Sequence, residues 1–274
     1  MPRRGVINVG PQSVKCRSHV ASLNVVTMTG PWIEFRPERR DAQARVLCVP
    51  YAGGSAQVFH ALARSMPERI EVGAIELPGR WSRGREPLLT RVSDASRSLA
   101  DEISRLSPRP YALFGYSLGG LIAFETARIL ARDAKQQRPR ALIVAAIEAP
   151  TEKSRLPHLH THSDAEFIRR HVQRYPGGIP PAVFGEPDLL EMLLPILKAD
   201  MQMYETYEYS PGEVLNCPVH AIAGGQDNLC SPSSMAGWKN ETTGSFFAET
   251  VAGNHFFIND AVDKLRATIV KALE

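Results

Sequence analysis

Residues 111–119 read Tyr-Ala-Leu-Phe-Gly-Tyr-Ser-Leu-Gly, an apolar run that leads into a Gly-x-Ser-x-Gly pentapeptide. A helical pattern from Leu118 to Asp133 follows directly. A pentapeptide of this kind between a strand and a helix indicates a sharp turn in which the serine takes a strained backbone conformation. We expect the turn to hold the hydroxyl of Ser117 above the sheet and the amide of Leu118 at a helix N-terminus, where it can stabilise an oxyanion. Because the pentapeptide alone is common by chance, this interpretation depends on the surrounding pattern.

The rest of the chain alternates short apolar runs with longer helical patterns, which is typical of an α/β fold with a mostly parallel sheet covered on both faces. The predicted strands are Trp32–Phe35, Arg45–Val49, Ile70–Ile75, Tyr111–Phe114, Ala141–Ala146, Val219–Ala223 and Phe246–Val251. The predicted helices are Gln57–Ser65, Val92–Leu106, Leu118–Asp133, Pro232–Lys239 and a last one from about Val262.

Residues 151–210 interrupt this alternation. They carry two helical patterns, Asp164–Arg174 and Asp188–Met203, and no convincing strand. A helical insertion between two late strands would sit above their carboxyl ends, where the sites of open α/β sheets lie. We therefore interpret residues 151–210 as a helical lid. Its apolar side chains can line a channel or pack the lid onto the body: Leu193, Leu194, Ile196, Leu197, Met201 and Met203.

The length and composition fit one domain. The chain has 274 residues and 43% hydrophobic content, enough for one sizeable core. We place the domain at residues 31–274 and expect residues 1–30 to be a disordered leader, with Met28 as an alternative start and an organelle transit peptide as the competing interpretation. Residues 1–33 hold four cations and no acid, so the rest of the chain is close to neutral, which argues against a nucleic-acid surface.

The sequence also bears on compartment and partners. No apolar run approaches the roughly 18 residues of a membrane span, and the N-terminus lacks the continuous apolar region of a secretory signal. The four cysteines show neither a CxxC motif nor a dense framework, as expected for reduced thiols. We expect a cytoplasmic monomer without membrane contact. The cysteines are Cys16, Cys48, Cys217 and Cys230.

Two further loops supply the partners that a serine nucleophile needs. A hydroxyl requires a base to take its proton, and the base requires a carboxylate to fix its tautomer. Asp227 ends a Gly-Gly-Gln-Asp loop after the strand Val219–Ala223, and His255 lies in a Gly-Asn-His loop after Phe246–Val251. The chain order serine, acid, histidine is that of the α/β-hydrolase fold. The sequence therefore predicts this fold, with Ser117 as nucleophile, His255 as base and Asp227 as the orienting acid.

Glu148 is a competing acid. It follows the predicted strand Ala141–Ala146, and some members of the α/β-hydrolase superfamily carry their carboxylate after that strand. We favour Asp227 because its glycine-flanked loop fits the usual position.

The second oxyanion donor should come from the loop after an early strand. Residues 49–55 read Val-Pro-Tyr-Ala-Gly-Gly-Ser, and the two glycines let the backbone approach a substrate closely. By position we assign the amide of Ala52 to the oxyanion hole, beside the amide of Leu118. A tight strand-to-helix turn would use the same glycines. The lysine and hydroxyl of a phosphate-binding loop are absent.

The remaining polar candidates receive no catalytic role. His158, His160 and His162 alternate as metal ligands on a strand would, but they lie at the Pro-containing start of the lid. We therefore predict no metal there, and the serine mechanism requires no metal or organic cofactor. His171 is interpreted as part of the lid surface, and Asp200 as a helix-surface or lid residue.

Taken together, these segments resemble the type II thioesterases, stand-alone α/β-hydrolases that accompany polyketide and nonribosomal peptide synthases. The resemblance extends from about residue 45 to the C-terminus. The matching segments are Pro50-Tyr-Ala-Gly-Gly-Ser-Ala56, Leu77-Pro-Gly-Arg80 with Arg83 and Glu86-Pro87, Gly115-Tyr-Ser-Leu-Gly119, Leu194-Pro-Ile-Leu-Lys-Ala-Asp200 followed by Tyr207, and Gly253-Asn-His-Phe-Phe257.

The resemblance implies hydrolysis of acyl groups from the phosphopantetheine thiol of an acyl or peptidyl carrier protein, for editing or release. The chain departs from the family's pattern at two places near the predicted site: Tyr116 stands where the family usually has histidine, and Ile147-Glu-Ala-Pro150 replaces a Gly-Arg-Ala-Pro-like stretch. Arg80, Arg83 and Arg85 are interpreted either as contacts for an acidic carrier or as solvated arginines.

Three alternatives remain open. A carboxylesterase or lipase would use the same triad on oxygen esters, and an acyltransferase would pass the acyl group to an alcohol or amine. The third is a catalytically inactive hydrolase fold that binds an acyl chain or a partner, although an intact set of three side chains argues against it.

Overall fold

The fold is described by a computed structural model that covers Met1 and residues 31–133, 136–152 and 156–274. These residues form one seven-stranded sheet with the order β1-β3-β2-β4-β5-β6-β7. The first strand runs antiparallel to β3, and every other neighbouring pair is parallel. The mostly parallel sheet predicted from the sequence is confirmed. The leader expected over residues 1–30 lies, apart from Met1, outside the described residues.

All seven predicted strands are present, with ends that differ from the prediction by at most two residues. The central strands are buried along nearly their whole length, because helices cover both faces of the sheet, and this explains their continuous apolar runs. The strands are β1 (Ile33–Phe35), β2 (Ala44–Val49), β3 (Ile70–Ile75), β4 (Tyr111–Tyr116), β5 (Ala141–Ala145), β6 (Val219–Gly224) and β7 (Phe246–Val251).

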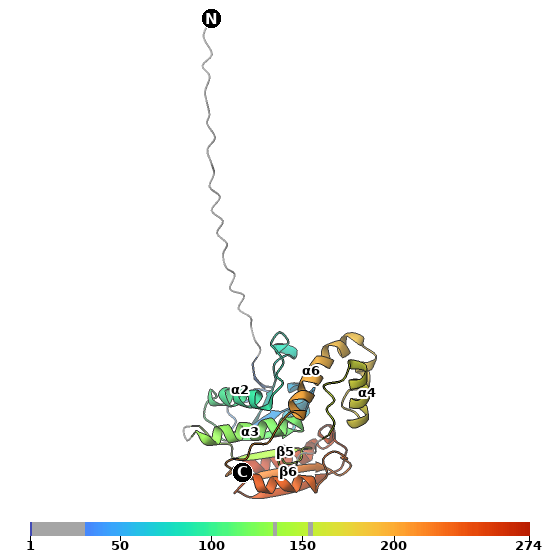
Figure 1. Cartoon of the computed structure of the whole chain (residues 1–274). Helices are drawn as coiled ribbons and strands as arrows, with labels where there is room; N and C mark the ends of the chain where they lie inside the picture. Colours follow the sequence, from blue (N-terminus) through green and yellow to red (C-terminus); the bar gives the residue numbers. More distant parts are fainter. Residues whose placement is uncertain (2–30, 134–135, 153–155) are drawn as a thin grey trace.

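Four helices flank the sheet, two on each face. On one side, α2 (Val92–Ser104) and α3 (Leu118–Arg132) pack against each other and on the sheet, as Figure 1 shows. On the other side lie α1 (His60–Ser65) and α7 (Val262–Leu273). Each face has its own apolar cluster, so the sheet divides the core into two layers.

The described residues between β5 and β6 form three helices: α4 (Asp164–Arg174), α5 (Pro181–Phe184) and α6 (Pro187–Glu205). In Figure 1, α4 and α6 stand next to each other beyond the sheet. A third apolar cluster joins them, with Phe167 from α4 and Leu197 and Met201 from α6. The sequence predicted α4 and α6 at nearly these bounds but not the short α5.

Two predicted helices take a different form. The segment Gln57–Ser65 begins as a 3₁₀ turn at Ala56–Phe59, where the hydroxyl of Ser55 accepts a hydrogen bond from the amide of Gln57, and only then becomes α1. The prediction of an α-helix at Pro232–Lys239 is wrong, because the chain forms a 3₁₀ helix at Ser234–Glu241. At its start, the hydroxyls of Ser231 and Ser233 bond to each other, and the amide and hydroxyl of Ser234 donate to the hydroxyl and carbonyl of Ser231. Such local bonds compete with α-helical hydrogen bonds. Two short 3₁₀ turns, Trp81–Arg83 and Phe257–Asn259, were not predicted.

The three described cysteines, Cys48, Cys217 and Cys230, are buried and unbridged. Cys16 lies outside the described residues. Among the helices of the described part of the chain, none combines the length and apolarity that a bilayer crossing demands.

Candidate active site

Ser117 occupies a strained turn between β4 and α3. Its backbone angles are φ 51° and ψ −123°, a conformation that residues other than glycine rarely adopt. A Cβ atom on Gly119 would lie 2.1 Å from the carbonyl oxygen of Val49, and one on Gly115 would lie 2.2 Å from the carbonyl oxygen of Gly119. The pentapeptide therefore needs both glycines because neighbouring backbone fills the space that a side chain would take.

The turn is fixed by backbone hydrogen bonds. The amide of Ser117 donates to Ala145 at the end of β5, at 2.8 Å, and the amide of Gly120 donates to the carbonyl of Ser117, also at 2.8 Å. Leu118 is the first residue of the 15-residue α3. Its amide thus lies at the positive end of a full helix, beside the serine.

His255 connects the serine to a carboxylate. Its Nε2 lies 3.1 Å from the Oγ of Ser117, and its Nδ1 lies 2.8 Å from the Oδ2 of Asp227. The two loops that follow β6 and β7 bring Asp227 and His255 together, because these strands are parallel neighbours that end at the same edge. Both residues are buried. The structure therefore brings together the three side chains predicted from the sequence.

Asp227 is itself held in place. Its Oδ1 accepts hydrogen bonds from the amides of Leu229 at 2.9 Å and Cys230 at 3.2 Å. Within the described residues, the ring nitrogens of His255 bond to Ser117 and Asp227 and to no other side chain. Glu148, the competing acid, is buried in the wall of the adjacent cavity and does not bond to the imidazole.

A cavity that opens to solvent lies at the serine. Ser117 and His255 line it together with Ala52 and Leu118, whose amides the sequence assigned to the oxyanion hole. Of the lid side chains considered for a channel, Met201 reaches the cavity. The others are packed in apolar clusters or, for Ile196, buried: Leu193, Leu194, Ile196, Leu197 and Met203. Further lining residues are Tyr51, Ile147, Leu156, Tyr175, Tyr204 and Phe256.

The loop that carries Ala52 is anchored by buried charges. The next residue, Gly53, has φ 77° and donates its amide to the Oδ2 of Asp200 at 2.7 Å. A Cβ on Gly53 would lie 2.9 Å from a methyl group of Leu197 in α6. Of the two interpretations of Asp200, helix surface or lid, the surface one is wrong, because its carboxylate is almost fully buried against this loop. Asp200 lies in α6.

Two of the three arginines considered for carrier contact are also buried. Arg80 pairs with Asp200, and Arg83 pairs with Glu86 and donates to the carbonyl of Glu76. Neither the carrier-contact nor the solvated interpretation holds for them, because their guanidinium groups are used inside the protein. Arg85 is exposed.

His171 is buried as well, so its assignment to the lid surface is wrong. Its ring stacks on Phe167 and contacts Tyr175, and it lines the cavity near His255. Burial, assisted by the charges of Arg174 and His255, lowers the pKa of His171 to about 4. A spacing of four residues from Phe167 on α4 was the sequence signal for this inward position.

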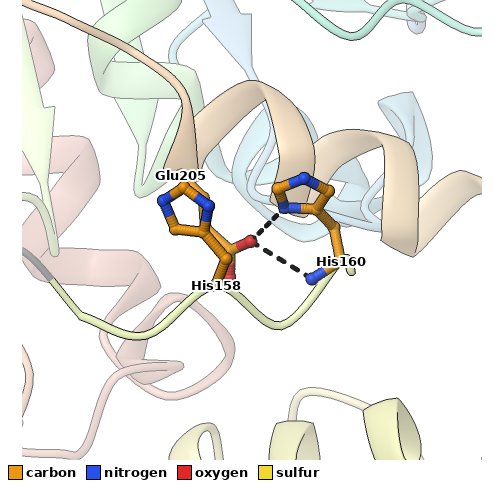
Figure 2. Close-up of side chains that lie close together, drawn as sticks. All are labelled: His158, His160 and Glu205. Atoms are coloured by element: carbon orange, nitrogen blue, oxygen red, sulfur yellow. Dashed lines mark hydrogen bonds and ion pairs between the residues drawn. The ribbon is translucent and has the colours of Figure 1, made fainter. Parts of the chain in front are cut away.

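His158, His160 and Glu205 form the one group of metal-ligand types found in the described residues, with donor atoms within 4.8 Å of one another. Figure 2 shows the carboxylate of Glu205 facing the ring and the amide of His160. It pairs with the Nδ1 of His160 at 2.5 Å and accepts the amides of Leu159 and His160 at 2.7 and 3.2 Å. Arg174 lies 3.8 Å from the same carboxylate and would repel a cation. The group therefore fastens the segment before α4 to the end of α6, and we assign no ion to it.

Known proteins resemble this chain along most of its length. A family model described as thioesterase domain matches residues 44–273. The gramicidin S biosynthesis protein GrsT of Aneurinibacillus migulanus is 32% identical over 239 residues, which cover 87% of this chain and 92% of that protein. Thioesterase PikA5 of Streptomyces venezuelae is 34% identical over 85% of this chain and 82% of its own length. The solved structure of the type II thioesterase BorB, from the borrelidin biosynthetic cluster, aligns with a TM-score of 0.81 at 32% identity, covering 89% of this chain and 98% of that one.

Proposed function

The chain belongs to the thioesterase family, and from this premise we propose that it hydrolyses acyl thioesters on the phosphopantetheine arm of a carrier protein through an acyl-serine intermediate. The observation that carries the proposal is the relay from Ser117 through His255 to Asp227, with hydrogen-bond distances of 3.1 and 2.8 Å. Relatives named for gramicidin S biosynthesis and for the borrelidin cluster support an editing or release role in polyketide or nonribosomal peptide biosynthesis.

In the acylation step, His255 takes the proton of Ser117 as the hydroxyl oxygen attacks the thioester carbonyl. Asp227 accepts a hydrogen bond from the Nδ1–H of His255, which leaves Nε2 as the proton acceptor and stabilises the imidazolium that forms. The thiolate of the carrier arm is a good leaving group, because a free thiol has a pKa of about 8.5.

The amides of Ala52 and Leu118 are proposed to hold the oxyanion of the tetrahedral intermediate. Both residues line the cavity at Ser117, and the amide of Leu118 belongs to the first turn of α3. Removing one such donor typically costs about 100- to 1000-fold in rate. In the second half of the reaction, water activated by His255 releases the acid from the acyl-serine.

The carrier protein is the proposed partner, and the cytoplasm the proposed compartment. The free state of Cys48, Cys217 and Cys230 supports a reducing environment. The relay and the cavity are formed within one chain, which supports a monomer as the functional unit. The segment of about residues 151–210 is proposed to act as the lid of this cavity, since His171, Tyr175, Met201 and Tyr204 contribute to its wall.

The test is a hydrolysis panel of acyl-carrier and acyl-N-acetylcysteamine thioesters against oxygen esters with the same acyl chains. We expect turnover of the thioesters, a covalent acyl adduct on Ser117 detected by mass spectrometry, and loss of both in Ser117→Ala. A clear preference for oxygen esters would make the protein a carboxylesterase or lipase instead. Transfer of the acyl group to an added alcohol or amine in preference to water would make it an acyltransferase.

A non-catalytic role is tested separately. A serine-reactive phosphonate should label Ser117 in the folded protein. If correctly folded protein resisted labelling, an acyl-binding hydrolase fold without activity would be the better description.

A further inference from the structure

Tyr116, the residue directly before Ser117, bridges two backbone groups of the loop that carries His255. Its hydroxyl donates to the carbonyl oxygen of His255 at 2.8 Å and accepts the amide of Ile258 at 3.2 Å. The first of these bonds joins residues 139 positions apart in the chain. The end of β4 is thereby tied to the loop after β7.

The surroundings of Tyr116 keep this bridge dry. The side chain is fully buried, and its ring contacts Tyr51 and Phe257 at centroid distances of 5.9 and 5.1 Å. Burial raises the pKa of the phenol well above its usual range, so the hydroxyl keeps the proton that it donates. Tyr116 does not belong to the lining of the cavity at Ser117. The tyrosine that stands in place of the family's usual histidine therefore contacts the loop of His255 and does not line the cavity at Ser117.

Tyr116 is the one residue in the described part of the chain that forms a hydrogen bond to the backbone carbonyl of His255. Other bonds fasten the neighbouring residues: the carbonyl of Gly253 accepts the amide of Gln226 at 2.9 Å, and the side chain of Asn254 accepts the amide of Phe256 at 2.9 Å. No other donor among the described residues reaches the carbonyl of His255. Gly253 has φ 127°, a conformation that favours glycine, so the loop turns toward His255 at a position where a side chain would be strained.

We propose that Tyr116 is a positioning residue that fixes the backbone of His255 relative to Ser117, an inference that rests on the proposed function. One end of the tyrosine is joined by a peptide bond to the nucleophile, and the other end bonds to the base. Strand β4 therefore sets the separation of the two reacting side chains, while Asp227 sets only the rotation of the ring. A base held about 1 Å from its best position can cost on the order of 100-fold in rate.

The test compares Tyr116→Phe with Tyr111→Phe. Both tyrosines belong to β4 and are buried, and each donates to a backbone carbonyl, Tyr111 to Gln137 at 2.6 Å. Tyr111 lies at the opposite end of the strand, so its variant reports the loss of a comparable hydrogen bond away from the site. We expect both variants to remain folded and to lose similar thermal stability. In Tyr116→Phe alone, kcat should fall about tenfold while KM stays within about twofold, because positioning and not substrate binding is impaired.

A second readout separates this inference from the proposed substrate. The rate at which a fluorophosphonate labels Ser117 depends on the serine and its base but not on a thioester or a carrier. We expect labelling of Tyr116→Phe to slow about tenfold, in parallel with kcat, and labelling of Tyr111→Phe to match wild type. If Tyr116→Phe were labelled more slowly but the wild type hydrolysed no thioester, the proposed function would be wrong and the positioning role would stand. The positioning role would be overturned if Tyr116→Phe kept the labelling rate and kcat of the wild type, or if Tyr116→Phe and Tyr111→Phe lost labelling rate and kcat equally.

Discussion

Arg80 and Asp200, which lie 120 residues apart in the chain, form a buried bidentate ion pair. The Nη1 and Nη2 atoms of Arg80 lie 3.0 and 2.8 Å from the two carboxylate oxygens of Asp200. The side chains are only 4% and 1% exposed. Because Asp200 also accepts the amide of Gly53 and Arg80 donates to the carbonyl of Gly54, the pair ties α6 to the loop of the proposed oxyanion hole.

Asp200→Ala is expected to destabilise the protein strongly. The substitution leaves the guanidinium of Arg80 buried without its partner, and breaking a buried pair in this way costs about 3–5 kcal/mol. Urea unfolding measures the change. The matched control is Arg105→Ala, which breaks an exposed pair with Glu102 and should cost less than about 1 kcal/mol. Similar losses in the two variants would show that the buried pair has no special role in stability.

Gly119→Ala is expected to disrupt the turn at Ser117. The added methyl group would lie 2.1 Å from the carbonyl oxygen of Val49, which belongs to β2 and cannot move aside freely. We expect a loss of about 3 kcal/mol or more in the free energy of unfolding. Gly185→Ala is the control, since its new methyl group would meet nothing closer than 3.6 Å and should change stability by less than about 1 kcal/mol. Unchanged stability in Gly119→Ala would contradict the steric account of the pentapeptide.

The features that the sequence predicted well are local ones. Strand β5 lies within one residue of its predicted bounds because a strand buried on both faces is one continuous apolar run. The turn at Ser117 was predictable because its glycines, its strand and its helix adjoin in the chain. The meeting of Asp227 with His255 followed from chain order alone, since parallel neighbours end at one edge.

The features that the sequence missed depend on partners far away in the chain. Arg80 and Asp200 look like surface residues in isolation, and only their mutual pairing makes burial of both charges tolerable. The local pattern around each holds no sign of the other. Tyr116 was recognised as unusual, but its partner lies in a loop 139 residues away. The local periodicity of the sequence therefore could not predict hydrogen bonds and ion pairs between polar groups that are far apart in the chain.

Asp227→Asn tests the assignment of the acid. The amide of the variant would favour the wrong tautomer of His255, and kcat should fall by about four orders of magnitude. Glu148→Gln changes the competing carboxylate in the same conservative way and should keep kcat within about tenfold of wild type, because His255 bonds to Asp227. Steady-state kinetics on one acyl thioester measures both. The reverse ranking of the two variants would make Glu148 the acid.

His171→Phe should change how stability depends on pH. The pKa of His171 falls from 6.5 to about 4 in the fold, first because burial penalises the charged ring. The unfolded chain therefore takes up a proton at a higher pH than the folded chain, so this residue's contribution to stability is present above pH 6.5 and is lost as the pH falls toward 4. Between about pH 7.5 and about pH 5, wild type should lose roughly 2 kcal/mol more than the variant. Phenylalanine keeps the ring contacts with Phe167 and Tyr175, so urea unfolding at both pH values isolates the titration. Equal losses in the two proteins would mean that His171 takes up its proton without cost in the folded state.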